Sequence, residues 1–133
     1  MSADADEVWN RACDPDAPFT HPGDAALAAV LLCHGTAMNG GLLHACETLD
    51  PDQRERAVVG YRLLGLDAAA DAVEDVTRQA AALDGDDPAA AERLEEQANR
   101  RYDAALPEWD ETVDRAFRDH LRRSPEAYAP LGG

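Results

Sequence analysis

Start and stop signals for α-helices recur along this 133-residue chain, and they constrain its fold more than any other feature. Asp50, Pro51 and Gln53 combine an N-cap acceptor, a proline at the first helical position and a glutamine at the third. A second Asp-Pro pair, Asp87 and Pro88, repeats the start signal. These signals predict helices over residues 5–12, 24–38, 42–49, 51–64, 67–83, 88–106 and 109–123.

Apolar side chains recur at helical spacing within these segments, whereas strand patterns are almost absent. The predicted apolar faces consist of Leu27, Val30, Leu31, His34 and Met38; Ala69, Ala72, Val73, Val76, Ala80 and Leu83; Leu94, Ala98, Tyr102 and Leu106; and Trp109, Val113, Phe117 and Leu121. The pattern predicts an all-α fold, a compact single-domain bundle of about six or seven helices with short loops. We expect one helical domain over residues 1–133, with an initial helix and a Pro-rich loop over 1–22 and the main core over 23–133.

The chain is strongly acidic, because 27 Asp and Glu residues face only 12 Lys and Arg residues, for a formal net charge of −15. A field this negative repels nucleic acid and anionic membranes and attracts basic proteins. We therefore expect a partner with a basic protein surface, no direct nucleic acid binding and no membrane binding. A surface adapted to solubility or to a salty cytoplasm would be equally acidic.

Further features of the sequence predict a cytoplasmic protein. No apolar run approaches the roughly 18 residues of a membrane span. The first residues, MSADADEVWN, lack the basic start and apolar stretch of a signal peptide. Cys13, Cys33 and Cys46 make an odd number of cysteines, which is typical of reduced thiols rather than a disulfide framework.

Residues 34–49, HGTAMNGGLLHACETL, and the preceding cysteine come nearest to a metal or catalytic site. The residues with suitable ligand atoms are Cys33, His34, His44 and Cys46. Their spacing is poor for one ion, because adjacent residues on a helix point about 100° apart. A cysteine nucleophile also needs a base and an anion-binding pocket, and the sequence defines neither. We predict no catalytic residue, no metal and no cofactor; an enzyme or metal-binding protein using His34, His44 and Cys46 is an alternative.

The Asn39-Gly40-Gly41 triplet in this stretch favours a structural interpretation. Asparagine tolerates the left-handed backbone that ends a helix, and glycine adopts it without penalty. Gly41 also has no side chain to block the close approach of a neighbouring element. The triplet therefore predicts an elbow between two packed helices.

Three segments resemble a known family. They are GDAALAAVLLCHGTAMNGGLLHACETL, RAVVGYRLLGLDAAADAVEDV and LPEWDETVDRAFRDHLRRSPEAY, covering roughly residues 23–78 and 106–128. In order and spacing, including the Asn-Gly-Gly motif, they resemble the DNA-mimic (DMP-type) all-helical bacterial domain family. The resemblance implies an acidic protein, with a homodimer as one option, that imitates the DNA phosphate array and sequesters a DNA-binding regulator.

The predicted charge pattern on two helices fits such mimicry. Asp67, which we also expect to cap its helix, lies within about 60° of Asp71 and Glu74 at about 100° per residue. They are about one turn apart, a spacing comparable with that of phosphates along a DNA strand. A second ridge is predicted from Asp86, Asp87, Glu92, Glu95 and Glu96. Arg78 and Arg93 interrupt the pattern, as they would on an ordinary solvated helix face.

Together these features favour a non-enzymatic acidic protein-binding domain. As a DNA mimic, it would occupy the basic DNA-binding surface of a regulator or other DNA-binding protein. The alternative in the same class is an immunity or antitoxin-like protein that neutralises a basic toxin. Both require the same electrostatic complementarity, so the sequence leaves both open.

Overall fold

The computed structural model describes residues 2–14 and 16–130, and its described elements confirm the all-α prediction. They are α1 (Ser2–Ala12), α2 (Pro22–Gly40), α3 (Leu42–Thr48), α4 (Pro51–Leu63), α5 (Asp67–Ala81), α6 (Pro88–Ala105), α7 (Asp110–Arg123) and the 3₁₀ helix η1 (Pro125–Ala127). No strand occurs within these two ranges. None of the helices described there is long and apolar enough to cross a membrane.

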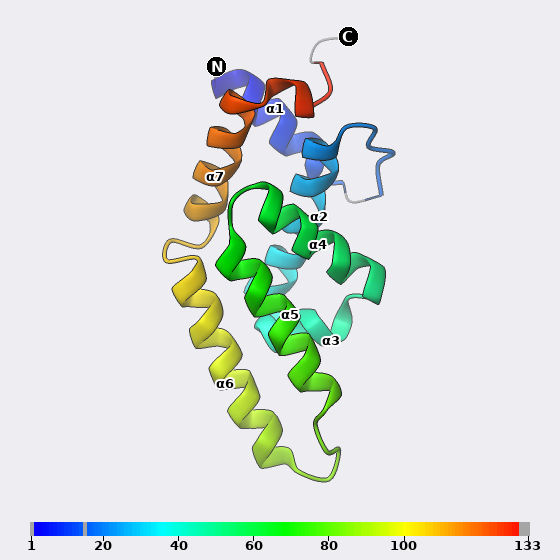
Figure 1. The fold of residues 1–133 in the computed structure, drawn as a ribbon, viewed down its shortest axis with the longest axis vertical. Helices are drawn as coiled ribbons and strands as arrows, with labels where there is room; N and C mark the ends of the chain where they lie inside the picture. Colours follow the sequence, from blue (N-terminus) through cyan, green and yellow to red (C-terminus); the bar gives the residue numbers. More distant parts are fainter. Residues whose placement is uncertain (1, 15, 131–133) are drawn as a thin grey trace.

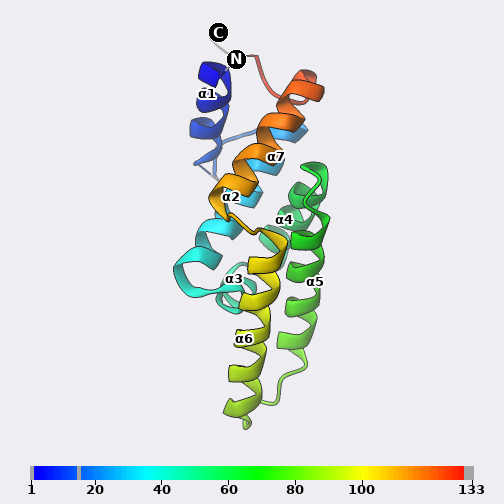
Figure 2. The same ribbon diagram turned by 90° about the vertical axis from the view of Figure 1, so that its left-hand side faces the viewer.

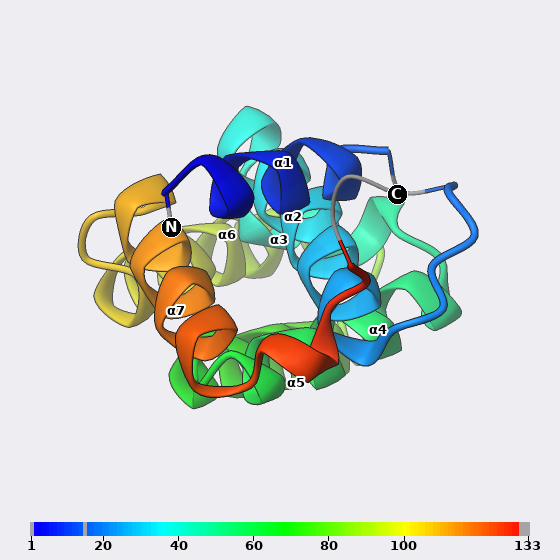
Figure 3. The ribbon, with the colours of Figure 1, turned by 90° about the horizontal axis from the view of Figure 1, so that it is seen from above.

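Helix α2 lies at the centre of the bundle and packs most extensively against α4, with further contacts to α1 and α3. Helices α5 and α6 form a long antiparallel pair, whose turn lies at the opposite end of the molecule from α1 and η1 (Figure 1). Turning the molecule shows that α7 continues upward from the end of α6 (Figure 2). Seen from above, α1 lies across the end of the molecule that is opposite the α5–α6 turn, beside α2 and α7 (Figure 3).

Helix α4 begins and ends as its sequence predicts. The Asp50 carboxylate accepts from the Gln53 backbone N–H at 2.8 Å, and the Gln53 side chain accepts from the Asp50 N–H at 2.9 Å. These reciprocal bonds form a capping box. At the other end Gly65 has φ 81°, and the Leu66 N–H donates to the Tyr61 carbonyl at 2.7 Å. A glycine in this conformation satisfies the last carbonyls of a helix.

The caps of the next two helices differ. Asp87 caps α6 as predicted and accepts from the Ala90 N–H at 3.0 Å. The prediction that Asp67 caps α5 is wrong, because Leu66 occupies the N-cap position and Asp67 is the first helical residue. The turn that ends α4 uses Leu66 and leads directly into α5. The Asp67 carboxylate therefore faces the positive end of the helix dipole without acting as a cap.

The elbow between α2 and α3 is located at Gly41, which has φ 94°. Asn39 and Gly40 stay helical in the last turn of α2. The Leu42 N–H donates to Oδ1 of Asn99 on α6 at 3.2 Å. A Cβ atom on Gly41 would lie 2.9 Å from the same oxygen, so the absent side chain lets α6 reach the elbow.

The predicted apolar faces meet in one core. Its largest fully buried side chains include Tyr61, Phe117, Leu27, Leu42 and Leu106. Leu31, Ala80, Leu83 and Leu121 pack against it and are partly buried.

Two residues depart from the predicted faces, since Met38 is 49% exposed and Trp109 is 45% exposed. Met38 lies in the last turn of α2, at the elbow, where it borders a surface hollow rather than the core. Trp109 lies in the connection between α6 and α7. Its φ of 46° is outside helical geometry, so α7 begins only at the next residue.

Candidate functional site

The three acids of the predicted α5 ridge lie around an arginine of the neighbouring helix. Arg62, in the last turn of α4, donates to Asp71 at 2.8 Å and also to Glu74. Its Nη1 atom lies 4.0 Å from Oδ1 of Asp67. Hydrogen bonds to Asp71 and Glu74 raise the pKa of Arg62, which keeps the guanidinium charged. The structure thus brings the three acids together, but with a cation among them that compensates part of their charge.

A fourth acid of α5, Asp75, is paired as well. Arg101 of α6 places Nη1 2.6 Å from Asp75 Oδ2, and Arg78 pairs with the other carboxylate oxygen. The hydrogen bond from Arg101 is the main cause that lowers the pKa of Asp75. Arg78, which interrupts the predicted ridge, thus pairs with Asp75 and not with Glu74 one turn earlier. Intramolecular arginines thus accompany all four acids.

The second predicted ridge is free of such partners. Asp86, Asp87, Glu92, Glu95 and Glu96 are all exposed. In the described part of the chain, no basic side chain lies within the 4.0 Å of an ion pair from any of them. They occupy the α5–α6 turn and the first half of α6, far from α1 and η1 (Figure 1). Uncompensated negative charge therefore gathers at this end of the molecule.

Three acids and one asparagine of α6 lie on one side of the helix, and we call these four residues the α6 stripe. At about 100° per residue, Glu92, Glu96, Asn99 and Asp103 fall within about 60° of one another. The buried face of the helix is a separate set: Leu94, Ala98 and Tyr102. Asp103 was not among the predicted site residues. Its spacing of seven residues from Glu96, two helical turns, is the sequence signal that identifies it.

A hydrogen-bonded chain that runs from the exposed Asp110 into the core links His34 to three other residues. His34 Nε2 lies 2.6 Å from the Asp110 carboxylate, and Nδ1 lies 2.7 Å from the Tyr102 hydroxyl. The hydroxyls of Tyr102 and Tyr61 are also 2.7 Å apart. An ionised carboxylate can only accept, so in neutral His34 Nε2–H donates to Asp110 and Nδ1 accepts from Tyr102. Inside the core, the polar side-chain atoms of His34, Tyr61 and Tyr102, from α2, α4 and α6, are thus hydrogen-bonded to one another.

Burial makes this neighbourhood poor in nucleophiles. It raises the pKa of Cys33 to about 12, although a hydrogen bond with Tyr61 opposes the shift. Burial also raises the pKa of Cys46 and that of Tyr102. His44 lies exposed on α3, with Nδ1 3.3 Å from the Thr48 hydroxyl. Within residues 2–14 and 16–130, no group of three or more His, Cys, Asp or Glu residues could hold a metal ion.

We expect one fast-reacting thiol in the folded protein. With its pKa near 12, only about one Cys33 in ten thousand is a thiolate at pH 8. Cys46 is buried with a raised pKa, whereas Cys13 is exposed. Titration with Ellman's reagent at pH 8 should therefore modify Cys13 within minutes and the other two cysteines only after denaturation.

The substitution Cys13→Ser is the control and should abolish the fast phase. Rapid modification of native Cys33 or Cys46 would contradict the expectation and revive the cysteine-based enzyme as an alternative.

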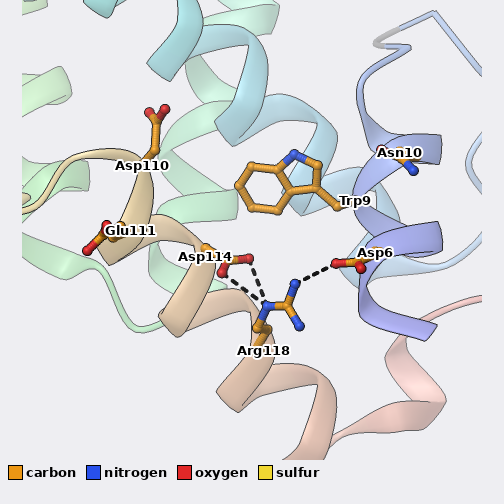
Figure 4. A pocket seen from close by; sticks show the side chains of 7 residues that line it. All are labelled: Asp6, Trp9, Asn10, Asp110, Glu111, Asp114 and Arg118. Atoms are coloured by element: carbon orange, nitrogen blue, oxygen red, sulfur yellow. Dashed lines mark hydrogen bonds and ion pairs between the residues drawn. The ribbon is translucent and has the colours of Figure 1, made fainter. Parts of the chain in front are cut away.

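A hollow of about 470 Å³ between α1 and α7 is a further feature that sequence analysis missed. Trp9 forms one wall, and Arg118 closes an end by donating to Asp6 at 2.7 Å and to Asp114 at 3.0 Å (Figure 4). Asp110, the partner of His34, lies on its rim. The two helices are 112 residues apart where Arg118 joins them, so no local pattern predicts this contact.

These features define a small, acidic, all-helical protein in which one helix, α6, carries a row of exposed carboxylates without internal ion pairs among the described residues. The similarity to known proteins extends over most of the chain and covers α2 to α7, while α1 lies before it. The chain belongs to the DMP19-like protein family, whose model matches residues 19–129, and this confirms the resemblance found in the sequence. Neither the comparison with curated proteins nor that with solved structures gave a match.

Proposed function

We propose that this chain is a non-enzymatic protein-binding domain that imitates the DNA phosphate array and occupies the basic DNA-binding surface of another protein. The observation that carries the proposal is the set of unpaired acids on the α5–α6 turn and α6. Membership of the DMP19-like family, a family of DNA mimics, supports it. The net charge of −15 provides the long-range attraction for a basic partner.

The two acidic ridges contribute unequally to the proposed surface. Glu92 and Glu96 lie about one helical turn, 5–6 Å, apart, and neither forms an ion pair among the described residues, although Arg93 lies beside them on the same helix. A partner's arginines can therefore replace water around these carboxylates directly. On α5, a basic partner also meets the positive charge of Arg62. We therefore assign the main contact to Asp86, Asp87, Glu92, Glu95 and Glu96, and a weaker one to Asp67, Asp71 and Glu74.

The test is release of DNA-binding proteins from immobilised DNA. A lysate of the cells that make this protein is bound to DNA-cellulose at low salt, and the column is then eluted with the purified chain. We expect wild type to release a DNA-binding protein and the triple variant Glu92→Gln, Glu95→Gln, Glu96→Gln to release little of it. Release should weaken above physiological ionic strength, where exposed charges are screened over about 8 Å.

A second triple variant controls for net charge. Glu7→Gln, Glu47→Gln and Glu55→Gln remove as much charge from exposed glutamates of α1, α3 and α4, so release should stay at the wild-type level. If both triple variants release equally little of the DNA-binding protein, net charge rather than the position of the acids explains the effect. If wild type releases none, the chain is not a DNA mimic. If the released protein is a toxin nuclease rather than a regulator, the immunity-protein alternative replaces the proposal.

A further inference from the structure

The α6 stripe leads to a hollow of about 290 Å³ at the junction of α2, α6 and the start of α7. Asn99 and Asp103, the last two residues of the stripe, both line this hollow. Met38, Gly41 and Trp109 form other parts of its wall. The stripe, with three acids and the neutral Asn99, runs about 16 Å from Glu92 to Asp103 at 1.5 Å per residue and ends at a hollow with Trp109 in its wall.

Trp109 is held in this wall at a conformational cost. Its backbone has φ 46° and ψ −111°, a combination that non-glycine residues rarely adopt. Its indole Nε1–H donates to Asp103 Oδ1 at 2.9 Å, which fixes the ring beside the carboxylate. Even so, Trp109 and Met38 remain about half exposed. An ordered, exposed tryptophan beside a hollow is typical of an energetically dominant contact in a protein interface.

We propose that this hollow anchors an arginine side chain of the basic partner, an inference that rests on the proposed function. The guanidinium stacks on the face of Trp109 and donates to Asp103. Among the described residues, Asp103 has no basic partner within ion-pair distance, and its Oδ2 is free to accept. Met38 covers the aliphatic part of the arginine.

Charge and shape select arginine over other occupants. A purely apolar side chain would offer no donor to Oδ2 of Asp103 and would displace water from this carboxylate without replacing it. Lysine would supply charge, but its compact ammonium lacks the planar surface that stacks on an indole and the paired donors that match a carboxylate. Arginine supplies both. The acids at Glu92 and Glu96 then bind further basic residues of the same partner.

The test uses defined peptides with the full-length chain, so it does not depend on identifying the partner. Hexa-arginine and hexa-lysine peptides are titrated into ¹⁵N-labelled protein at low ionic strength, and the two indole N–H signals are followed by NMR. We expect hexa-arginine to bind more tightly and to shift the Trp109 signal. Trp109→Ala and Asp103→Asn should each weaken hexa-arginine binding about fivefold and hexa-lysine binding less. Asp103→Asn keeps an acceptor for the indole, so it tests the charge if Trp109→Ala disturbs the fold.

Trp9→Phe assigns the second indole signal and, as the control at the other tryptophan, should leave both affinities unchanged. The anchor is overturned if the Trp109 signal stays still, or if the two peptides bind equally in wild type and variants. If hexa-arginine binding then still depends on Glu92, Glu95 and Glu96, the acidic surface stands without the anchor. If neither peptide binds, both the anchor and the acidic surface are wrong.

Discussion

Replacing Arg11 with methionine is expected to lower the free energy of unfolding by about 3 kcal/mol, because it removes the charged partner of a buried carboxylate. Asp24 is only 2% exposed and accepts from Arg11 at 2.6 Å and from the Ala129 N–H at 2.7 Å. Without the guanidinium, one backbone N–H remains to compensate the charge. Arg11 is itself about one-third exposed, so water replaces part of the lost interaction and the cost falls at the lower end of the usual range.

The measurement is urea unfolding followed by circular dichroism. Arg122→Met is the matched control, because Arg122 pairs with Asp119 at a site where both side chains are exposed, and it should behave nearly as wild type. Arg11→Met combined with Asp24→Asn should cost less than the two single changes added together, since the double variant buries no unpaired charge. If Arg11→Met is as mild as Arg122→Met, the contact that joins α1, α2 and the segment after η1 contributes little to stability.

Helix ends were predictable from the sequence where their geometry depends on only a few neighbouring residues. The capping box of Asp50 and Gln53 and the glycine stop at Gly65 both involve residues within one turn of each other. Asp67 failed as a cap because the stop signal before it already uses the connecting residue. Trp109 failed because a spacing of four residues continues beyond the actual start of α7, and periodicity alone does not locate a helix end.

The partners of the acids were beyond prediction for a different reason. On one helix, the spacing of Glu74 and Arg78 predicts an ion pair, but Arg62 of α4 approaches Glu74 instead. The contact between Arg62 and Glu74 depends on which faces of α4 and α5 turn toward each other, and local sequence spacing does not predict this orientation. The same holds for His34 and Tyr102, which are 68 residues apart. Their sequence signal is weaker: each places a polar group in an apolar stripe, and a buried polar group needs a partner.

An acid that already pairs with an arginine of the same chain says less about a binding partner than an acid without such a pair. Net charge and helical spacing treat the carboxylates of α5 and α6 alike, yet arginines compensate those on α5 and leave those on the first half of α6 free. An unpaired exposed carboxylate adds little to folding, whereas it can contribute directly to binding a cation. The acids most relevant to a partner are therefore those without an internal one.

The close approach of α2 and α4 at Gly60 gives the second large effect, and Gly60→Ala is expected to lower the free energy of unfolding by about 2–3 kcal/mol. A Cβ atom on Gly60 would lie 2.6 Å from the Ala26 carbonyl oxygen and 3.0 Å from Cγ2 of Val30. The carbonyl belongs to the backbone of α2 and cannot rotate away, so α2 and α4 must move apart. These two helices share the most extensive contact in the bundle, and the next residue is the buried Tyr61, which belongs to the hydrogen-bonded chain of His34.

Helix propensity alone predicts that Gly60→Ala raises the free energy of unfolding, because alanine is favoured over glycine by about 1 kcal/mol within a helix. Gly35→Ala isolates that term: Gly35 lies in α2 with no atom within 4 Å of its added Cβ, so we expect a gain of about 0.5–1 kcal/mol. Urea unfolding of both variants therefore separates packing from propensity. If Gly60→Ala stabilises the protein as Gly35→Ala does, α2 and α4 do not approach each other as closely as the structure shows. If it destabilises, native Cys33, which lies beside Tyr61, should also react faster with Ellman's reagent than in wild type, because separating α2 from α4 exposes its thiol.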